Sequence, residues 1–312
     1  MHVLTVHRAE SGMKLLQFLS RRLGRDIPAS ALHRWIRTGQ VRVNKGRAKP
    51  FMQLRQDDMV RTPPFAQPEP APRNPDETLS PRAGQQLGRE LHILAVTHDM
   101  LALVKSPGLP THQGSGWDDS VAARLAGTFA ALPYVPAPAH RLDKDASGIL
   151  LAGTTHAAQQ QLHTWLADFK NAASPMQREY LAWVCGCWPH SGQALLHDYL
   201  QKKKKPQHAR EKVHISGVAA GKEAWATAES AGTRIHPALG PVTLLRLCLR
   251  TGRTHQLRAQ LAGRGFPIAG DTKYGGPAWR PLLLHAWRIT LPTGDVFMDL
   301  PAWEEELAVH DA

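Results

Sequence analysis

The chain has 312 residues, 42% of them apolar, and a formal net charge of +12. This length and apolar content allow two domains with buried cores. The charge favours a polyanionic partner, either a nucleic acid or an acidic membrane face, although it also serves solubility alone. No apolar run approaches 18 residues, which excludes a membrane-spanning helix. Three cysteines without a pairing or ligand pattern predict no metal site and a reducing, cytoplasmic environment.

Most of the positive charge lies in the first fifth of the chain. Residues 1–63 hold 13 Lys and Arg against 4 Asp and Glu, whereas the remaining residues hold 25 against 22. This distribution is typical of a small RNA-docking module joined to a nearly neutral larger domain. Hydrophobic periodicity predicts two helices, with Ser30 as the N-cap of the second, and three short strands. The helices span 13–23 and 30–38, and the strands lie near 3–6, 41–44 and 59–61.

We therefore expect a small α/β RNA-binding domain over residues 1–63. Few acidic residues interleave with its basic ones, which weakens the alternative of an ordinary solvated face. The side chains expected to contact RNA phosphates lie on the second helix and in the loop after it. They are Arg34, Arg37, Arg42, Lys45, Arg47 and Lys49.

Residues 64–90 are rich in proline and poor in apolar residues, which predicts a linker. Residues 91–307 are predicted to form one α+β domain. Its strands and helices do not alternate strictly, so we expect a mixed sheet and not a doubly wound one. The predicted strands are 91–96, 100–104, 148–152, 180–184, 242–249 and 282–291, and the predicted helices are 120–132, 155–169 and 255–263.

The segment HRLDKDASGILLAG, residues 140–153, runs from charged residues into an apolar strand. A carboxylate there would lie at a sheet edge, and an adjacent cation would keep it ionised and fixed, as a nucleophile requires. Asp143 is the candidate. By spacing alone, a surface loop with ordinary salt bridges is the better explanation of the segment, since such clusters of charges are common.

Two further segments contain candidate site residues. In residues 249–276 a strand ends at Thr251-Gly252 and a helix follows, so Arg253 and Arg258 would suit an anion at the helix start. Tyr180 begins an apolar strand, where an aromatic ring could stack on an extruded base. The alternatives are a structural histidine at His255, an arginine that only covers a helix face, and a core tyrosine.

Together these segments resemble the RluA-type pseudouridine synthases. The matching stretches occur in the family's order, which makes chance agreement remote. They are ALVKSPGLPTHQG at 102–114, HRLDKDASG at 140–148, REYLAWVCG at 178–186, TGRTHQLRAQLAGRGFPIAGDTKYG at 251–275 and LLHAWRITLP at 283–292. Ahead of them, WIRTGQVRVN at 35–44 resembles part of the S-four RNA-binding domain.

The resemblance implies a catalytic domain built on a mixed, largely antiparallel sheet. It implies Asp143 as the catalytic aspartate, Tyr180 as the tyrosine that packs on the target base, and Arg253 as the basic partner of the aspartate. Leu142, His255 and Leu284 are expected to support the site, and Arg141 to contact RNA. Lys144, Ala146, Ser106 and Arg178 depart from the commoner family residues without removing a reacting group.

The activity implied is isomerisation of uridine to pseudouridine, which needs no cofactor because substrate and product are isomers. Structured RNA, most simply large-subunit ribosomal RNA, is the expected partner of a monomer, and transfer RNA is the alternative. Two other functions compete with this one. A non-catalytic ribosome-assembly factor would not need Asp143, Tyr180 and Arg253. A hydrolase with paired Asp143 and Asp145 conflicts with the opposite faces that such residues take on a strand.

Overall fold

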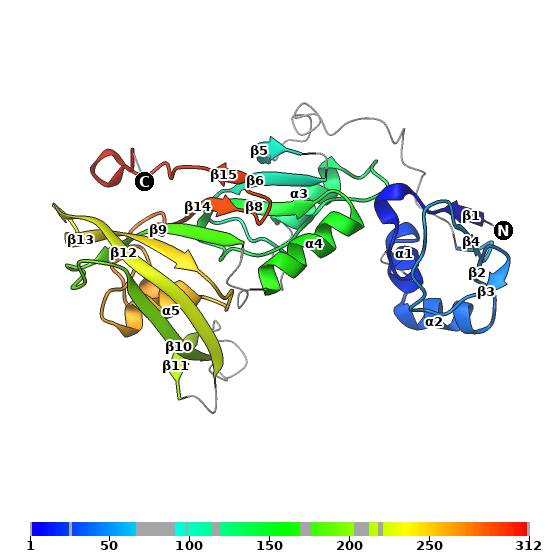
Figure 1. Cartoon of the computed structure of the whole chain (residues 1–312), viewed down its shortest axis with the longest axis horizontal. Helices are drawn as coiled ribbons and strands as arrows, with labels where there is room; N and C mark the ends of the chain where they lie inside the picture. The colour runs from blue at the N-terminus through cyan, green and yellow to red at the C-terminus, as the bar shows by residue number, and fades with distance from the viewer. Residues whose placement is uncertain are drawn as a thin grey trace.

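The computed structural model shows a small sheet in the N-terminal part of the chain and a large sheet in the rest (Figure 1). It describes residues 2–24, 27–66, 91–97, 99–113, 119–168, 176–202, 212–217 and 221–310. Most of the predicted linker over 64–90 lies outside the described residues. Among the helices that the structure describes, none has the length and apolar character needed to cross a bilayer.

The N-terminal part is a four-stranded sheet with two helices packed beside it. The strand order is β1-β4-β2-β3. Leu32, Trp35 and Ile36 recur at helical spacing on one buried face of the second helix, which explains why this stretch forms a helix. The bounds are β1 His2–Thr5, η1 Arg8–Glu10, α1 Leu15–Arg22, α2 Ala29–Arg37, β2 Arg42–Val43, β3 Gly46–Arg47 and β4 Met59–Thr62.

The predicted N-cap of the second helix is wrong by two residues. Pro28 occupies the N-cap position of α2, so Ser30 lies inside the first turn. A proline there accommodates an extended backbone just before the helix, and its missing N–H is not needed by the helix.

The large sheet has 11 strands, and its main path runs β11-β10-β12-β13-β9-β14-β8-β6-β5, with β15 on β14 and β7 on β8. Among the strand pairs of the described residues, only β14 and β8 run parallel. The expected α+β class with a mixed, largely antiparallel sheet is confirmed. The strands are β5 His92–Val96, β6 Met100–Lys105, β7 Ala137–Pro138, β8 Ser147–Gly153, β9 Gln177–Cys185, β10 Ala194–Lys202, β11 Val213–Ser216, β12 Lys222–His236, β13 Gly240–Leu249, β14 Leu284–Thr290 and β15 Val296–Met298.

The α-helices of this part are short, and two of them begin with a side-chain cap. Ser120 and Thr155 accept hydrogen bonds from the backbone N–H groups of Ala123 and Ala158, at 3.0 and 3.1 Å. Such caps satisfy amides that the first helical turn leaves without a partner. The elements are α3 Val121–Thr128, α4 His156–Ala167, α5 Gln256–Gly263, η3 Thr272–Tyr274 and η4 Glu305–Leu307.

The sequence analysis did not predict the longer strands β10 and β12, nor the short strands β3, β7, β11 and β15. Along β12 the buried positions alternate as Ala224, Ala226 and Ala228, and they belong to the core beneath α5. Alanine favours a helix intrinsically, so its alternation is a weak strand signal until a neighbouring strand supplies the partner.

A glycine, Gly148, allows the close pairing of β8 with β14 just after the segment 140–146. At Gly148 φ is +113°, and a Cβ there would lie 2.3 Å from the backbone oxygen of Ala286. Only glycine lets β8 approach β14 this closely at its first residues. The segment 140–146 is thereby held at the ends of β9 and β14.

The N-terminal part packs against the rest through α1. Tyr134, which precedes β7, is buried in the N-terminal core. The guanidinium of Arg21 lies 4.1 Å from the centre of its ring and donates a 2.8 Å hydrogen bond to the carbonyl of Val135. The two parts of the chain therefore share a packed contact.

Candidate active site

A cavity open to solvent lies where the segment 141–146 meets β9, the end of β13 and the start of β14. Seven of the residues expected at the site line it together, although they come from distant parts of the chain. They are Arg141, Leu142, Asp143, Tyr180, Arg253, His255 and Leu284. The six basic residues predicted in the N-terminal part do not line this cavity.

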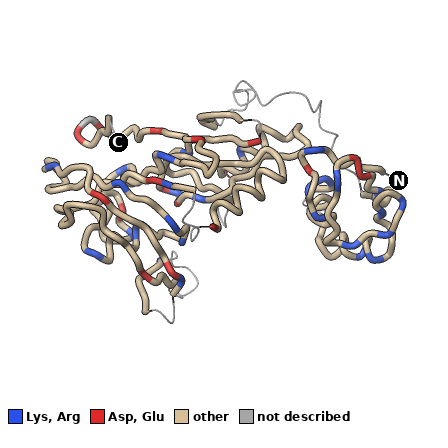
Figure 2. The backbone as a smooth tube through the Cα atoms, in the orientation of Figure 1, with Lys and Arg blue, Asp and Glu red and all other residues tan. Residues whose placement is uncertain are grey.

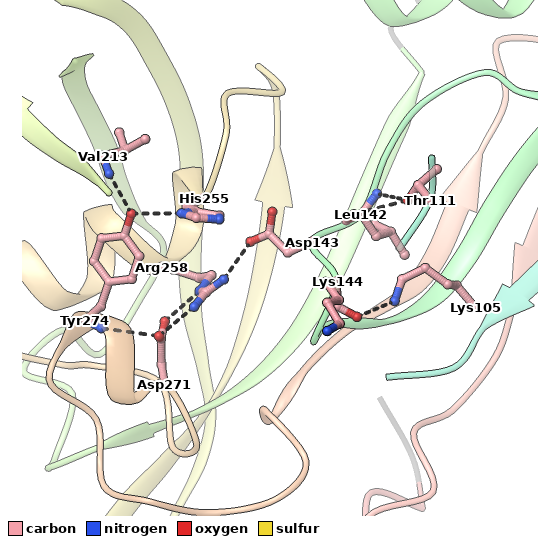
Figure 3. Close-up of polar contacts among 10 residues, drawn as sticks. All are labelled: Lys105, Thr111, Leu142, Asp143, Lys144, Val213, His255, Arg258, Asp271 and Tyr274. Atoms are coloured by element: carbon pink, nitrogen blue, oxygen red, sulfur yellow. Dashed lines mark hydrogen bonds and ion pairs between the residues drawn. The ribbon is translucent and has the colours of Figure 1, made fainter. Parts of the chain in front are cut away.

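The carboxylate of Asp143 points at a guanidinium (Figure 3). Its Oδ2 atom lies 3.3 Å from Nη1 of Arg258, and its side chain is 15% exposed. The backbone just before it is clamped by Thr111, whose hydroxyl accepts from the amide of Leu142 and donates to the carbonyl of the same residue, both at 3.1 Å. A carboxylate mounted this way has a restricted position and remains open to a ligand.

The backbone just after Asp143 is held by Lys105. The Lys105 amine is buried and donates 2.9 Å hydrogen bonds to the carbonyls of Ser106, Leu109 and Lys144. Burial lowers the pKa of this amine to about 7, against the opposing charges of Asp145 and Asp143. Lys105 at the end of β6 and Thr111 in the segment after it therefore fix the loop on both sides of Asp143, a role that the sequence analysis missed.

The expected pairing of Arg253 with Asp143 is wrong. Arg253 lies in the turn before α5, and its Nε atom donates to the carbonyl of Glu223 at 2.9 Å. The guanidinium that meets Asp143 belongs to Arg258, five residues later. The helix begins at Gln256, so Arg258 lies in its first turn on the face toward Asp143, whereas Arg253 points toward β12.

Arg258 is held from its other side by a second carboxylate. Its Nε and Nη2 atoms each lie 2.7 Å from an oxygen of Asp271, which is 1% exposed. Burial alone would lower the pKa of Arg258, but Asp271 and then Asp143 raise it above its ordinary value. A two-pronged pair of this kind fixes the orientation of the guanidinium as well as its charge.

Tyr274 and His255 complete the wall behind this ion pair (Figure 3). The Tyr274 hydroxyl accepts from the amide of Val213 and contacts Nδ1 of His255, both at 3.0 Å. His255 has a left-handed backbone with φ of +50°, which turns the chain into α5. Burial is the main cause that lowers the pKa of His255, which favours a neutral imidazole.

Tyr180 presents an aromatic ring to the cavity from β9 and is 6% exposed. Burial raises the pKa of its hydroxyl to about 12, an effect that Arg178 opposes and Asp143 assists. The phenol is therefore protonated at neutral pH. Such a ring can stack on a planar base and offer a hydrogen bond, but it is a poor base itself.

The arrangement combines an anchored carboxylate, a fixed cation, an aromatic ring and an apolar floor from Leu142 and Leu284. These groups can hold one planar base and bring a nucleophile to it or to its sugar. The sequence pattern pointed to most of the residues but not to Asp271. Asp271 follows a glycine-rich turn, and no local sequence signal links it to Arg258, 13 residues earlier.

Comparison with known proteins agrees with this chemistry. The family model for RNA pseudouridylate synthase matches residues 99–263. Ribosomal large subunit pseudouridine synthase C of Haemophilus ducreyi is 31% identical, with 98% of this chain and 90% of the relative covered. The protein of the same name from Escherichia coli strain K12 is 32% identical, with 94% and 90% covered.

The fold has solved counterparts as well. Human RNA Pseudouridylate Synthase Domain Containing 1 superposes with a TM-score of 0.57 at 21% identity, over 70% of this chain and 86% of that chain. This likeness concerns the fold alone, whereas the family follows from the sequence matches. The chain therefore belongs to the RNA pseudouridylate synthase family, in its RluA-type branch, and is an enzyme that isomerises uridine to pseudouridine in RNA.

Proposed function

We propose that this enzyme modifies specific uridines of large-subunit ribosomal RNA, with Asp143 as the nucleophile. The names of the relatives from Haemophilus ducreyi and Escherichia coli support the substrate. The observation that carries the chemistry is the fixed series Asp143, Arg258 and Asp271 beside the ring of Tyr180. Transfer RNA is the competing substrate.

The reaction detaches uracil from its ribose, rotates the base and joins it again through carbon 5. The target uridine must leave its stack, because a stacked nucleotide hides both its base face and its glycosidic bond. Asp143 supplies the nucleophile, which attacks either the glycosidic carbon of the ribose, with uracil as the leaving group, or the base itself, and it is released when the bond to carbon 5 forms. No net oxidation or reduction occurs, so the other residues of the cavity only have to hold and orient the base and move protons.

Arg258 takes the supporting role that the sequence suggested for Arg253. Its charge lies 3.3 Å from Asp143 and favours the ionised carboxylate, while Asp271 prevents it from turning away. Tyr180 would stack on uracil, and Leu142 and Leu284 would exclude water beneath the base. Because the phenol of Tyr180 is protonated at neutral pH, its hydroxyl acts as a hydrogen-bond donor before it can accept a proton.

The N-terminal part is proposed to dock RNA as an S-four-like domain over residues 1–63, joined to the catalytic domain, 91–307, through a linker over 64–90. In Figure 2, Lys and Arg gather over α2 and the β2–β3 turn. Five of the six predicted contacts are exposed, namely Arg34, Arg37, Lys45, Arg47 and Lys49, whereas Arg42 is half-buried. A monomeric state and a cytoplasmic location stay predictions.

The nucleophile is tested with Asp143→Asn, assayed by tritium release from RNA labelled at carbon 5 of uridine. We expect no release, with RNA binding retained, because the amide keeps the shape and loses the nucleophilic charge. The matched control is Asp295→Asn, an exposed aspartate in the turn between β14 and β15. Normal release by Asp143→Asn would overturn the assignment.

The substrate is tested by mapping pseudouridines in ribosomal and transfer RNA from cells that lack the gene. We expect sites to disappear from large-subunit ribosomal RNA and to return when the gene is restored. Loss confined to transfer RNA would replace the proposed substrate and leave the chemistry of Asp143 intact.

A further inference from the structure

A second hollow opens directly beside the catalytic cavity. His255 and Arg258 line both spaces, and the second is the larger and is open to solvent. Its other walls come from residues 107–108 and 144–145 on one side and from 270–273 and 278–282 on the other. Because the two spaces share these residues, an RNA strand whose target base lies in the first can continue into the second.

The charges of this groove suit a phosphate backbone. Lys144, Lys273 and Arg280 bring positive charge to its walls, against Asp145 and Glu304. The remaining carboxylate, Asp271, is buried and balanced by its two-pronged pair with Arg258. The groove therefore has a cationic excess beside a site that takes RNA.

Trp279 lines the groove with an aromatic ring, and its backbone is closely packed. Its half-buried indole meets the ring of His236 edge-on, with centres 5.1 Å apart. Its backbone packs on Gly270, where a Cβ would lie 2.8 Å from the carbonyl oxygen of Pro281 and 3.1 Å from that of Trp279. Gly270 also donates a 3.2 Å hydrogen bond to the carbonyl of Pro277. The backbone that carries the ring is thus held in place without a ligand.

We propose that this groove binds the unpaired nucleotide next to the target uridine, with its base stacked on Trp279 and its phosphate near Arg280. Stacking on an aromatic ring accepts every base, because each has a π-face. The enzyme would then select single-stranded character beside the target without reading the identity of that neighbour. This inference rests on the proposed function, since it places the neighbour by the position of the target.

The test combines Trp279→Leu with the removal of one base from the RNA, as in a double-mutant cycle, and compares kcat/KM for the four combinations. The probe is the shortest ribosomal RNA stem-loop in which the wild-type protein releases tritium, with an abasic site placed in turn on each side of the target. We expect Trp279→Leu to lower kcat/KM about tenfold on the intact RNA, as for one lost stacking contact. On one of the abasic RNAs the variant and the wild type should react equally. If Trp279→Leu lowers kcat/KM on both abasic RNAs by the same factor as on the intact RNA, the proposed stacking on Trp279 is wrong.

Two controls keep the result decisive. Trp225→Leu removes another half-buried tryptophan, which lines neither space and whose ring stacks on His197 with centres 3.7 Å apart. Because the substitution keeps the backbone, it should leave all rates unchanged. If Trp279→Leu does not fold, Arg280→Gln is compared with Arg246→Gln, an exposed arginine on β13. Only Arg280→Gln should weaken the salt dependence of kcat/KM, by about one unit of logarithmic slope. Equal slopes would overturn the proposal.

The outcomes also separate the two proposals. A wild-type protein that releases no tritium from any ribosomal fragment contradicts the proposed substrate. A wild type that releases tritium, and whose variants show no coupling to the neighbouring base, contradicts the groove alone.

Discussion

Positive charge is used in two different ways in the N-terminal part and at the catalytic cavity. Around α2 and the β2–β3 turn, Arg34, Arg37 and Arg47 are exposed to solvent. At the cavity, Arg258 is 5% exposed and bonded to two carboxylates. An exposed cation acts at long range and is screened by salt. A buried cation acts on its direct neighbours, and removing one partner of a buried ion pair strongly destabilises the fold. One region is suited to attract RNA and the other to position a reacting group.

The sharpest test of this comparison is Arg258→Gln against Arg253→Gln. We expect Arg258→Gln to slow tritium release at least a hundredfold and to lower the free energy of unfolding by about 3–5 kcal/mol, because it leaves Asp271 buried without its cation. Arg253→Gln should lower the rate only a few-fold. Single-turnover kinetics and urea unfolding measure both. A larger effect for Arg253→Gln would restore the pairing inferred from sequence.

Lys105→Met extends the test to a second buried cation. The change keeps a long side chain but removes the donor to three carbonyls, so the loop that carries Asp143 should lose its anchor. We expect kcat to fall about tenfold with KM nearly unchanged, and stability to fall by about 1–3 kcal/mol. Thr111→Val, which removes one hydroxyl from the other side of the loop, should have the smaller effect. If Lys105→Met and Thr111→Val raised KM to the same extent and left kcat unchanged, the positioning role of Lys105 would be contradicted.

The exposed cations should show the opposite behaviour. Replacing Arg34, Arg37, Arg47 and Lys49 together by Gln should weaken binding to ribosomal RNA about tenfold at low salt and flatten its salt dependence by about three units of logarithmic slope. Unfolding in urea should change little, because these side chains are exposed. Substitution is cleaner than deletion, since Tyr134 of the larger part lies in the N-terminal core. An unchanged salt slope would mean that this surface does not meet phosphates.

The smallest predicted effect concerns acid stability near the site. Burial, assisted by the charge of Arg178, lowers the pKa of His140 to about 3, and its Nε2 atom accepts from the amide of Leu151 at 3.2 Å. Between its ordinary value of 6.5 and about 3, the unfolded chain binds a proton that the folded chain does not, so stability falls as pH drops through this window. His140→Gln should make that fall shallower and change little at pH 7, as measured by urea unfolding from pH 4 to 7. An unaltered slope would show that another group controls it.

The sequence by itself determined the family, the main elements and most residues of the cavity. Asp143, Tyr180 and Leu284 stand in short stretches whose local order is readable along the chain, and α4 and β13 follow from local periodicity and capping. The catalytic roles of these residues stay predictions, but their convergence on one cavity is a property of the structure.

Only the tertiary structure decided which arginine meets Asp143 and what holds that arginine in place. The predicted start of α5 was within one residue of the observed one, so the choice between Arg253 and Arg258 depends on which side chain faces Asp143, 115 residues earlier in the chain. The pairs Arg258–Asp271 and Lys105–Lys144 join segments 13 and 39 residues apart, and β12 becomes a strand only beside β10 and β13. Burial and long-range pairing set these features, because the free energy of a charge or a strand depends on neighbours that the chain brings together only when it folds.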